Sequence, residues 1–238
     1  MKNILYEDEA ILVVYKPAGI ATQTSRVGQQ DMVSELKNYL ATKERKEPYL
    51  GLVHRLDQPV SGVLVFAKNK NAASSLSAQI TNGVMKKYYY TLIYGVPING
   101  KGQLVNYLYK DGRENLSFIV DETFPDGKKA VLNYRHKTTL MVLENNEEVS
   151  LMEIELITGR HHQIRAQMSH AGMPLLGDSK YGSAEAKELS RMIGCKNVAL
   201  CAYKICFNHP VTGERKTFVK LPEEDFFQPF LNIGMGIE

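Results

Sequence analysis

The chain has 238 residues, of which 44% are hydrophobic, and a net charge of +3. This length can bury a full core, and the composition excludes fibrous and disordered proteins. Its longest apolar runs fall far short of the roughly 20 residues that a membrane-spanning helix needs, and the acidic N-terminus lacks the apolar stretch of a signal peptide. We therefore expect a soluble, cytoplasmic protein, and the mild positive charge by itself barely favours a nucleic-acid partner.

Hydrophobic periodicity predicts short strands and helices in the first third of the chain. An N-cap residue and glycine mark the ends of the expected helices. The expected elements are a strand at Ile11–Tyr15, the turn Lys16–Gly19, a helix that begins at Asp31, a strand at Val63–Ala67 and a helix at Asn69–Asn82.

Strands dominate the expected middle of the chain, and two helices precede its last strands. The expected strands are Lys87–Val96, Gln103–Tyr109, Leu140–Leu143, Val149–Ile157, Asn197–Phe207 and Lys216–Lys220, with turns at Asn99–Gly100 and Asn145–Asn146, and the expected helices are His161–Ala171 and Ala184–Ile193. We find no repeat and no linker. The pattern predicts an α+β fold, with a mixed sheet and peripheral helices, in one domain over residues 1–238.

Three cysteines near the end of the chain carry little functional signal. Cys195, Cys201 and Cys206 are odd in number and show no C-x-x-C spacing. That arrangement is typical of reduced thiols in a core or strand rather than of a metal or redox site.

A polar segment before the Val63 strand places three reactive side chains within four positions. It reads Val-His-Arg-Leu-Asp-Gln-Pro-Val-Ser-Gly and contains His54, Arg55 and Asp57. A rigid loop of this kind can hold a catalytic carboxylate. Taken alone, however, an Asp-x-Pro sequence more often caps a turn, so both interpretations stay open here.

A second polar cluster lies where a strand leads into a helix. It reads Thr-Gly-Arg-His-His-Gln-Ile-Arg and contains Arg160 and Arg165, whose guanidinium groups suit phosphate or carboxylate. The alternative is an ordinary solvated helix start. The spacing of the histidines matches no metal-binding motif.

Together these segments resemble the RluA family of pseudouridine synthases. The resemblance extends through six motifs in family order: Lys16–Gly19, His54–Asp57 with Ser61–Gly62, Lys87–Tyr89 with Gly95, Leu156–Arg165, Gly177–Asp178 with Tyr181–Gly182, and Leu200–Ala202 leading to Phe207–Glu214. It implies the pseudouridine synthase fold, with a largely antiparallel central sheet and an RNA-binding cleft. It also implies a member without the N-terminal S4 domain.

The resemblance implies a site residue by residue. Asp57 matches the catalytic aspartate, Arg165 the arginine that pairs with it, and Tyr89 the active-site tyrosine. The reaction implied is isomerisation of uridine in RNA, with base flipping and with no metal or organic cofactor. The implied RNA-contacting residues are His54, Arg55, Arg160, His162 and Lys16.

Three positions depart from the commonest family pattern, namely Val60, His161 and Cys201, and none replaces an expected catalytic group. By analogy we expect ribosomal RNA as the substrate, with transfer RNA as the alternative, and a monomer. Two other functions remain open. One is a non-catalytic RNA-binding protein that uses the same cleft, and the other is a glycosyl-bond hydrolase with Asp178 as its second carboxylate.

Overall fold

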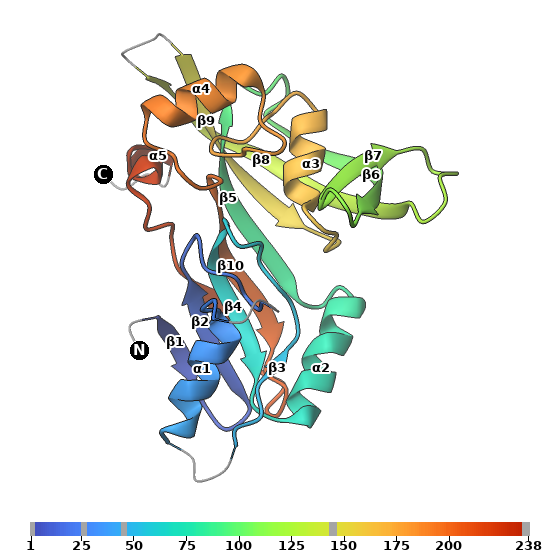
Figure 1. Cartoon of the computed structure of the whole chain (residues 1–238), viewed down its shortest axis with the longest axis vertical. Helices are drawn as coiled ribbons and strands as arrows, with labels where there is room; N and C mark the ends of the chain where they lie inside the picture. The colour runs from blue at the N-terminus through green and yellow to red at the C-terminus, as the bar shows by residue number, and fades with distance from the viewer. Residues whose placement is uncertain (1–2, 25–27, 44–46, 143–146, 235–238) are drawn as a thin grey trace. The chain divides into compact units, whose positions relative to one another are not determined.

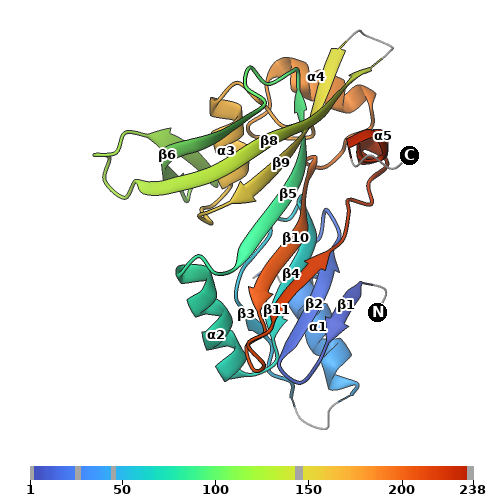
Figure 2. The ribbon, with the colours of Figure 1, turned by 180° about the vertical axis from the view of Figure 1, so that it is seen from behind.

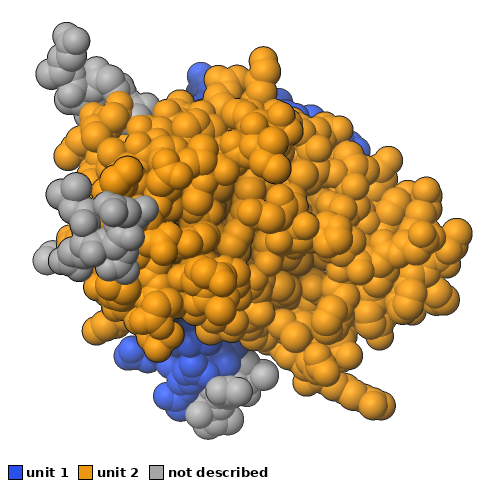
Figure 3. Space-filling model, turned by 90° about the horizontal axis from the view of Figure 1, so that it is seen from above, with its two compact units in different colours: residues 1–87, 202–221 blue, residues 88–201, 222–238 orange. Residues whose placement is uncertain are grey.

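The computed structural model describes residues 3–24, 28–43, 47–142 and 147–234. Its contacts separate the chain into two compact units (Figure 3). Unit 1 consists of Met1–Lys87 and Ala202–Leu221, and unit 2 of Tyr88–Cys201 and Pro222–Glu238. The single catalytic domain expected over residues 1–238 stays a prediction.

The sheet of unit 1 is built around two strands that are buried along their whole length. β2 (Ile11–Lys16) and β4 (Ser61–Ala67) pair antiparallel, with Ile11 opposite Ala67 and Lys16 opposite Gly62. Fully buried strands read as continuous apolar runs, which is why both were predicted. The neighbouring strands are β1 (Ile4–Glu7) on β2, β3 (Gly51–Leu52) on β4, β10 (Leu200–Asn208) on β4 and β11 (Arg215–Val219) on β10.

Two helices cover this sheet. α1 (Met32–Ala41) lies over β1 and β2 in Figure 1 and behind them in Figure 2. Asp31 caps it, as predicted, by accepting a hydrogen bond from the Ser34 N–H. α2 (Lys70–Thr81) packs Ala72 and Leu76 into a core shared with β2, β4 and β10.

The sheet of unit 2 has the strand order β5-β9-β8-β6-β7. These strands are β5 (Lys86–Tyr94), β6 (Lys101–Asp111), β7 (Leu116–Val120), β8 (Lys128–Val142) and β9 (Glu147–Leu156). β6 pairs antiparallel with both β7 and β8, and β8 pairs antiparallel with β9.

Four short helical segments accompany that sheet: α3 (Gln163–His170), α4 (Ala184–Met192), the 3₁₀ helix η1 (Asp225–Phe227) and α5 (Gln228–Gly234). α3 packs against β6 and β7, and its Ala166 clusters with Leu108 of β6 and Ala130 of β8. Because α3 begins beside β7, the polar residues at its start come close to the β6–β7 hairpin.

The α+β class and most of the expected elements are confirmed, with ends shifted by a few residues. β1, β3, β7, η1, α5 and most of β8 were not predicted, and the expected turn at Asn145–Asn146 lies outside the described residues. β8 escaped prediction because its many half-buried polar residues hide the apolar alternation. Among the described residues, no helix has the length and apolarity to cross a membrane.

Candidate active site

The predicted site residues belong to both units. Lys16, His54, Arg55 and Asp57 lie in unit 1, whereas Tyr89, Arg160, His162 and Arg165 lie in unit 2. Each group is characterised by the contacts within its own unit.

Asp57 lies in the segment that joins β3 to β4, and this loop is tied to the turn after β2. The Thr22 hydroxyl donates to the Leu56 carbonyl at 2.8 Å. In turn, the Leu56 N–H donates to the Thr22 hydroxyl oxygen at 3.1 Å. One residue beyond Asp57, the Gln58 carbonyl accepts the Gly19 N–H at 2.8 Å. The loop is therefore fixed on both sides of the half-buried Asp57.

Lys16 supplies a third tie between the two loops. Its side chain is completely buried, and Nζ donates to the carbonyls of Pro17, Ile20 and Gln58 at 2.7–3.1 Å. A buried ammonium needs such acceptors to offset its lost hydration. The RNA contact expected of Lys16 stays a prediction, while its burial argues for a structural function beside Asp57.

His54 also anchors this loop. Its Nε2 accepts a hydrogen bond from the Val65 N–H of β4 at 3.3 Å. Burial of the ring, together with the nearby Lys87 ammonium, lowers the pKa of His54 to about 3. The imidazole is therefore neutral at physiological pH and serves as an acceptor for the backbone of β4.

Arg55 differs from its neighbours because its side chain is exposed. Its Nη2 donates to the Gln23 side-chain oxygen at 3.2 Å. An exposed, planar guanidinium in the Asp57 loop can stack on a base. The RNA contact expected of Arg55 stays a prediction.

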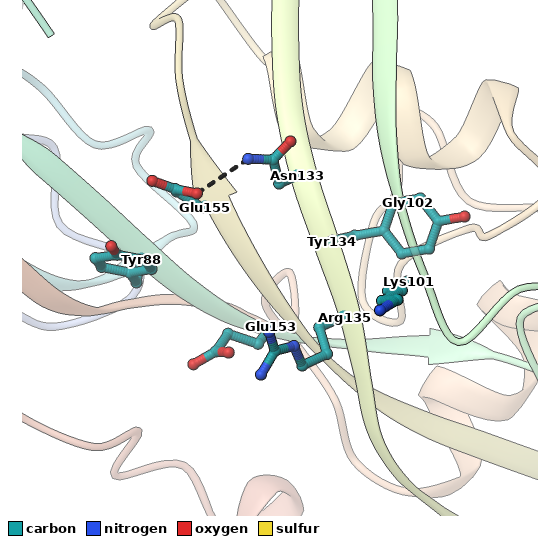
Figure 4. Close-up of a pocket in the computed structure, with 8 residues that line it drawn as sticks. All are labelled: Tyr88, Lys101, Gly102, Asn133, Tyr134, Arg135, Glu153 and Glu155. Carbon is teal, nitrogen blue, oxygen red and sulfur yellow. Dashed lines mark hydrogen bonds between the residues drawn. The ribbon is translucent and has the colours of Figure 1, made fainter.

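Tyr89 is buried in β5, with 5% of its surface exposed. Its neighbour Tyr88 lines a polar pocket of about 530 Å³ on the sheet of unit 2, shown in Figure 4. Because successive strand residues point to opposite faces, Tyr89 faces away from this pocket. The pocket's other lining residues are Lys101, Gly102, Asn133, Tyr134, Arg135, Glu153 and Glu155. Glu155 accepts from the Asn133 amide at 3.0 Å in a cross-strand pair.

Arg165 is buried in α3 and forms a two-pronged ion pair within unit 2. Its Nε and Nη2 donate to the two carboxylate oxygens of Asp178 at 2.7 and 2.6 Å. The guanidinium carbon lies 5.1 Å from the centre of the Tyr181 ring. Asp178 also accepts two backbone N–H groups, so both of its oxygens are engaged within the protein, which makes it a poor candidate for the general acid of a hydrolase.

His162 occupies the N-cap position of α3 but makes no capping hydrogen bond with its side chain. It adopts the left-handed conformation, with φ 50° and ψ 22°, and its side chain is buried. The Tyr181 hydroxyl lies 2.9 Å from His162 Nδ1, and the ring of His161 stacks on His162 at 3.7 Å. Burial first, and then the Arg165 charge, lowers the pKa of His162 to about 2, so the ring stays neutral. Its expected RNA contact stays a prediction.

Arg160 lies at the exposed start of the same segment. Its Nε donates to the Lys129 carbonyl at 3.0 Å. The side chain is therefore anchored at one nitrogen while the group as a whole remains exposed, which suits the phosphate contact expected of it.

Sequence reasoning missed the groups that hold the predicted residues in place. Thr22 was not singled out, Tyr181 was noted only as part of a motif, and Asp178 was considered only as part of that motif and as the second carboxylate of a hydrolase. A signal was present for Asp178, because a Gly-Asp-x-x-Tyr-Gly turn near a buried arginine offers a carboxylate. Nothing in the local sequence around Thr22 indicates its bond to Leu56.

The comparisons with known proteins identify the class. A family model described as RNA pseudouridylate synthase matches residues 10–170. The chain is 35% identical over 89% of its length to "Uncharacterized RNA pseudouridine synthase YhcT" of Bacillus subtilis, and it spans 66% of that relative. It is 34% identical over 94% of its length to "Ribosomal large subunit pseudouridine synthase D" of Neisseria meningitidis, of which it spans 59%.

A third relative is "tRNA pseudouridine synthase C" of Yersinia pestis, 30% identical over 91% of this chain and 85% of that one. Among solved structures, "Human RNA Pseudouridylate Synthase Domain Containing 4" superposes with a TM-score of 0.74 at 24% identity, over 98% of this chain and 93% of that one, which supports the shared fold. The protein belongs to the RluA family of RNA pseudouridylate synthases, which are isomerases that act on RNA. The family expected from the sequence motifs is confirmed.

Proposed function

We propose that this protein converts selected uridines of structured RNA into pseudouridine, with Asp57 as the catalytic carboxylate. Ribosomal RNA is the favoured substrate and transfer RNA the alternative, because similar proteins bear both names. We further propose that it acts as a monomer in the cytoplasm and needs no metal or organic cofactor.

The observation that carries the proposal is the fixed loop around Asp57. Thr22 holds Leu56 on one side, and Gly19 holds Gln58 on the other. A carboxylate whose backbone is tied on both sides loses little orientational freedom when it meets a substrate. Pre-organisation of this kind favours reaction at a single atom of a bound uridine.

The proposed reaction breaks the bond between ribose C1′ and uracil N1 and forms a bond between C1′ and C5. The C5 hydrogen leaves as a proton and N1 gains one, so that the product is an isomer of the substrate. A carboxylate such as Asp57 can add to an electrophilic carbon of the base or the sugar and then leave again, and it can stabilise positive charge on the sugar.

Two groups of unit 2 have proposed roles in this reaction. The Tyr89 ring stacks against the uracil, and its hydroxyl takes part in proton transfer. The cationic Arg165 favours the ionised form of Asp57 in a site that excludes water. Both side chains are buried, as residues of a dry site should be.

Exposed guanidinium groups are the proposed RNA contacts. Arg55 occupies the space that the flipped base leaves, and Arg160 binds phosphate. The buried Lys16 and the neutral His54 act on RNA indirectly, by holding the Asp57 loop in place.

Tritium release tests the proposal. RNA that carries uridine tritiated at C5 is incubated with the protein, because the new bond at C5 expels that hydrogen. We expect wild-type protein to release tritium and the Asp57→Asn variant to release none while still binding the RNA in a filter assay. The matched control is Asp225→Asn, an exposed aspartate of η1, which should match the wild type.

Equal release by Asp57→Asn would remove Asp57 from the mechanism. Binding without release by the wild type, across ribosomal and transfer RNA, would contradict the enzyme proposal and favour an RNA-binding protein. Release of free uracil instead of tritium would indicate a hydrolase.

A further inference from the structure

Arg165 is paired with a buried carboxylate of its own unit, Asp178. Arg165 is 3% exposed, and two of its guanidinium nitrogens donate to the carboxylate of the buried Asp178. Such fork-to-fork pairing fixes both the position and the plane of a guanidinium. The plane of Arg165 is therefore set by Asp178 within unit 2.

Asp178 is itself fixed by the turn that contains it. Its Oδ1 accepts the N–H groups of Lys180 at 3.0 Å and Tyr181 at 3.1 Å, and its carbonyl accepts the Gly182 N–H at 3.0 Å. A carboxylate with this many backbone donors has one orientation. We call residues 178–182 the support turn.

Tyr181 connects the support turn to α3 and β7. Its ring lies under the Arg165 guanidinium, its hydroxyl accepts the Ser117 N–H at 2.7 Å, and the same hydroxyl lies 2.9 Å from His162 Nδ1. The Ser169 hydroxyl adds a bond from α3 to the Tyr181 carbonyl at 2.5 Å.

We propose that Asp178 is a positioning residue for the isomerase reaction and acts entirely through Arg165, whose guanidinium packs on the Tyr181 ring. This inference rests on the proposed function, in which Arg165 assists Asp57. The pairing also keeps a buried cation close to charge neutrality, so that Arg165 remains in a water-free site with its plane already set.

A double-mutant cycle tests this proposal, with Asp178→Asn, Arg165→Lys and the double variant. Asparagine keeps the shape of the side chain and one carbonyl acceptor for the turn, but it lacks the charge and the second acceptor oxygen. Lysine keeps the charge but lacks the planar fork. The readout is the single-turnover rate of tritium release at saturating RNA, together with the RNA dissociation constant.

We expect each single variant to lower the rate about 100-fold, as misplacement of a catalytic group does, with RNA affinity unchanged. The double variant should be no slower than Arg165→Lys, because Asp178 has nothing to position when the fork is absent. Asp225→Asn, which leaves this network intact, serves as the matched control and should keep the wild-type rate.

Two results would overturn this proposal and leave the proposed function intact. One is a double variant whose loss of rate is the product of the two single losses. The other is a folded Asp178→Asn protein that keeps the wild-type rate. Absence of tritium release from the wild type would instead overturn the proposed function. If Asp178→Asn does not fold, the rate of hydrogen exchange at the Arg165 Nε–H of the wild type tests whether Asp178 holds the guanidinium. Slow exchange, assigned by loss of the signal in Arg165→Lys, supports the pairing, and fast exchange overturns it.

Discussion

Arg55 and Lys16 show how burial separates two cations that lie near the same carboxylate. Arg55 is exposed and contacts only the side chain of Gln23 among its described partners, whereas Lys16 is buried and donates to three carbonyls. The Arg55 guanidinium is therefore accessible to a ligand, whereas the Lys16 ammonium stabilises the fold. Charge alone does not distinguish them.

Arg55→Ala should weaken activity more on folded RNA than on unstructured RNA. In a folded RNA the target base leaves a stack at a cost of a few kcal/mol, and Arg55 is proposed to fill the vacated space. In an unstructured RNA that cost is small. Tritium release measured in parallel on a stem-loop and on a denatured fragment gives the comparison.

Arg113→Ala serves as the control for Arg55→Ala, because Arg113 is an exposed arginine of the β6–β7 turn in unit 2. Equal losses on both RNAs for Arg55→Ala would assign Arg55 to general phosphate binding rather than to base flipping.

The residue types at the site could be predicted from the sequence, but their environments could not. The His-Arg-Leu-Asp motif indicates Asp57, and the second motif indicates Arg165. Whether His162 meets RNA or Tyr181 depends on a left-handed backbone conformation that non-glycine residues seldom adopt. Tertiary contacts decide that conformation, and no local pattern reports them.

At the scale of elements, the Asp57 loop depends on how closely β4 approaches β10. A Cβ atom at Gly62 would lie 2.5 Å from the backbone N and O of Ala202, and the φ of Gly62 is 132°. Only glycine fits there. The small-residue pair that follows the Asp57 loop therefore has a packing explanation that is independent of chemistry.

Gly62→Ala should destabilise the protein more than Gly83→Ala does. Both glycines have positive φ, and so both substitutions bring backbone strain of roughly 1–2 kcal/mol. Only Gly62 adds a clash, since nothing lies within 4 Å of a Cβ at Gly83. We expect the clash to cost about 1–3 kcal/mol more.

Urea unfolding of the two glycine variants measures the difference between them. Equal losses of stability would mean that β10 moves aside without cost, and they would contradict the packing explanation for Gly62.

The elements with the strongest apolar signals were the ones that could be predicted. β2 and β4 are buried on both faces and read as unbroken apolar runs, and α2 begins at an Asn69 cap. β8 is the opposite case, because most of its 15 residues are half-buried and polar and apolar side chains are mixed along it. Its pairing with β6 joins residues that lie far apart in the sequence, such as Lys101 and Arg135, so no local pattern reports it.

At the scale of the whole molecule, the buried His162 and the half-buried His54 and His161 make both units sensitive to acid. Burial, with the Lys87 charge, lowers the pKa of His54 to about 3. Burial, followed by neighbouring cations, lowers the pKa of His161 to about 4 and that of His162 to about 2. An unfolded chain would take up these protons near the ordinary pKa of about 6.5.

The free energy of unfolding should therefore fall as the pH drops below about 6.5, because the unfolded chain binds more protons than the folded one. His54 contributes at most about 1.4 kcal/mol per pH unit in this range. His54→Gln keeps an acceptor for the Val65 N–H without a titratable ring, and it should flatten the slope between about pH 6 and about pH 4.

Urea unfolding at a series of pH values measures the slope, with His170→Gln as the matched control, since His170 is exposed at the end of α3. A slope unchanged in His54→Gln, or flattened equally in His170→Gln, would contradict the assignment to His54.

The left-handed conformation of His162 has a consequence for protein engineering. Glycine or asparagine would adopt φ 50° more readily, and relief of that strain is worth on the order of 1 kcal/mol. Either replacement would also remove the ring nitrogen that meets the Tyr181 hydroxyl. A selection for heat resistance alone would thus enrich replacements at residue 162 that weaken the hold on Tyr181 beneath Arg165. A library of variants of this protein should therefore be screened for turnover as well as for melting temperature.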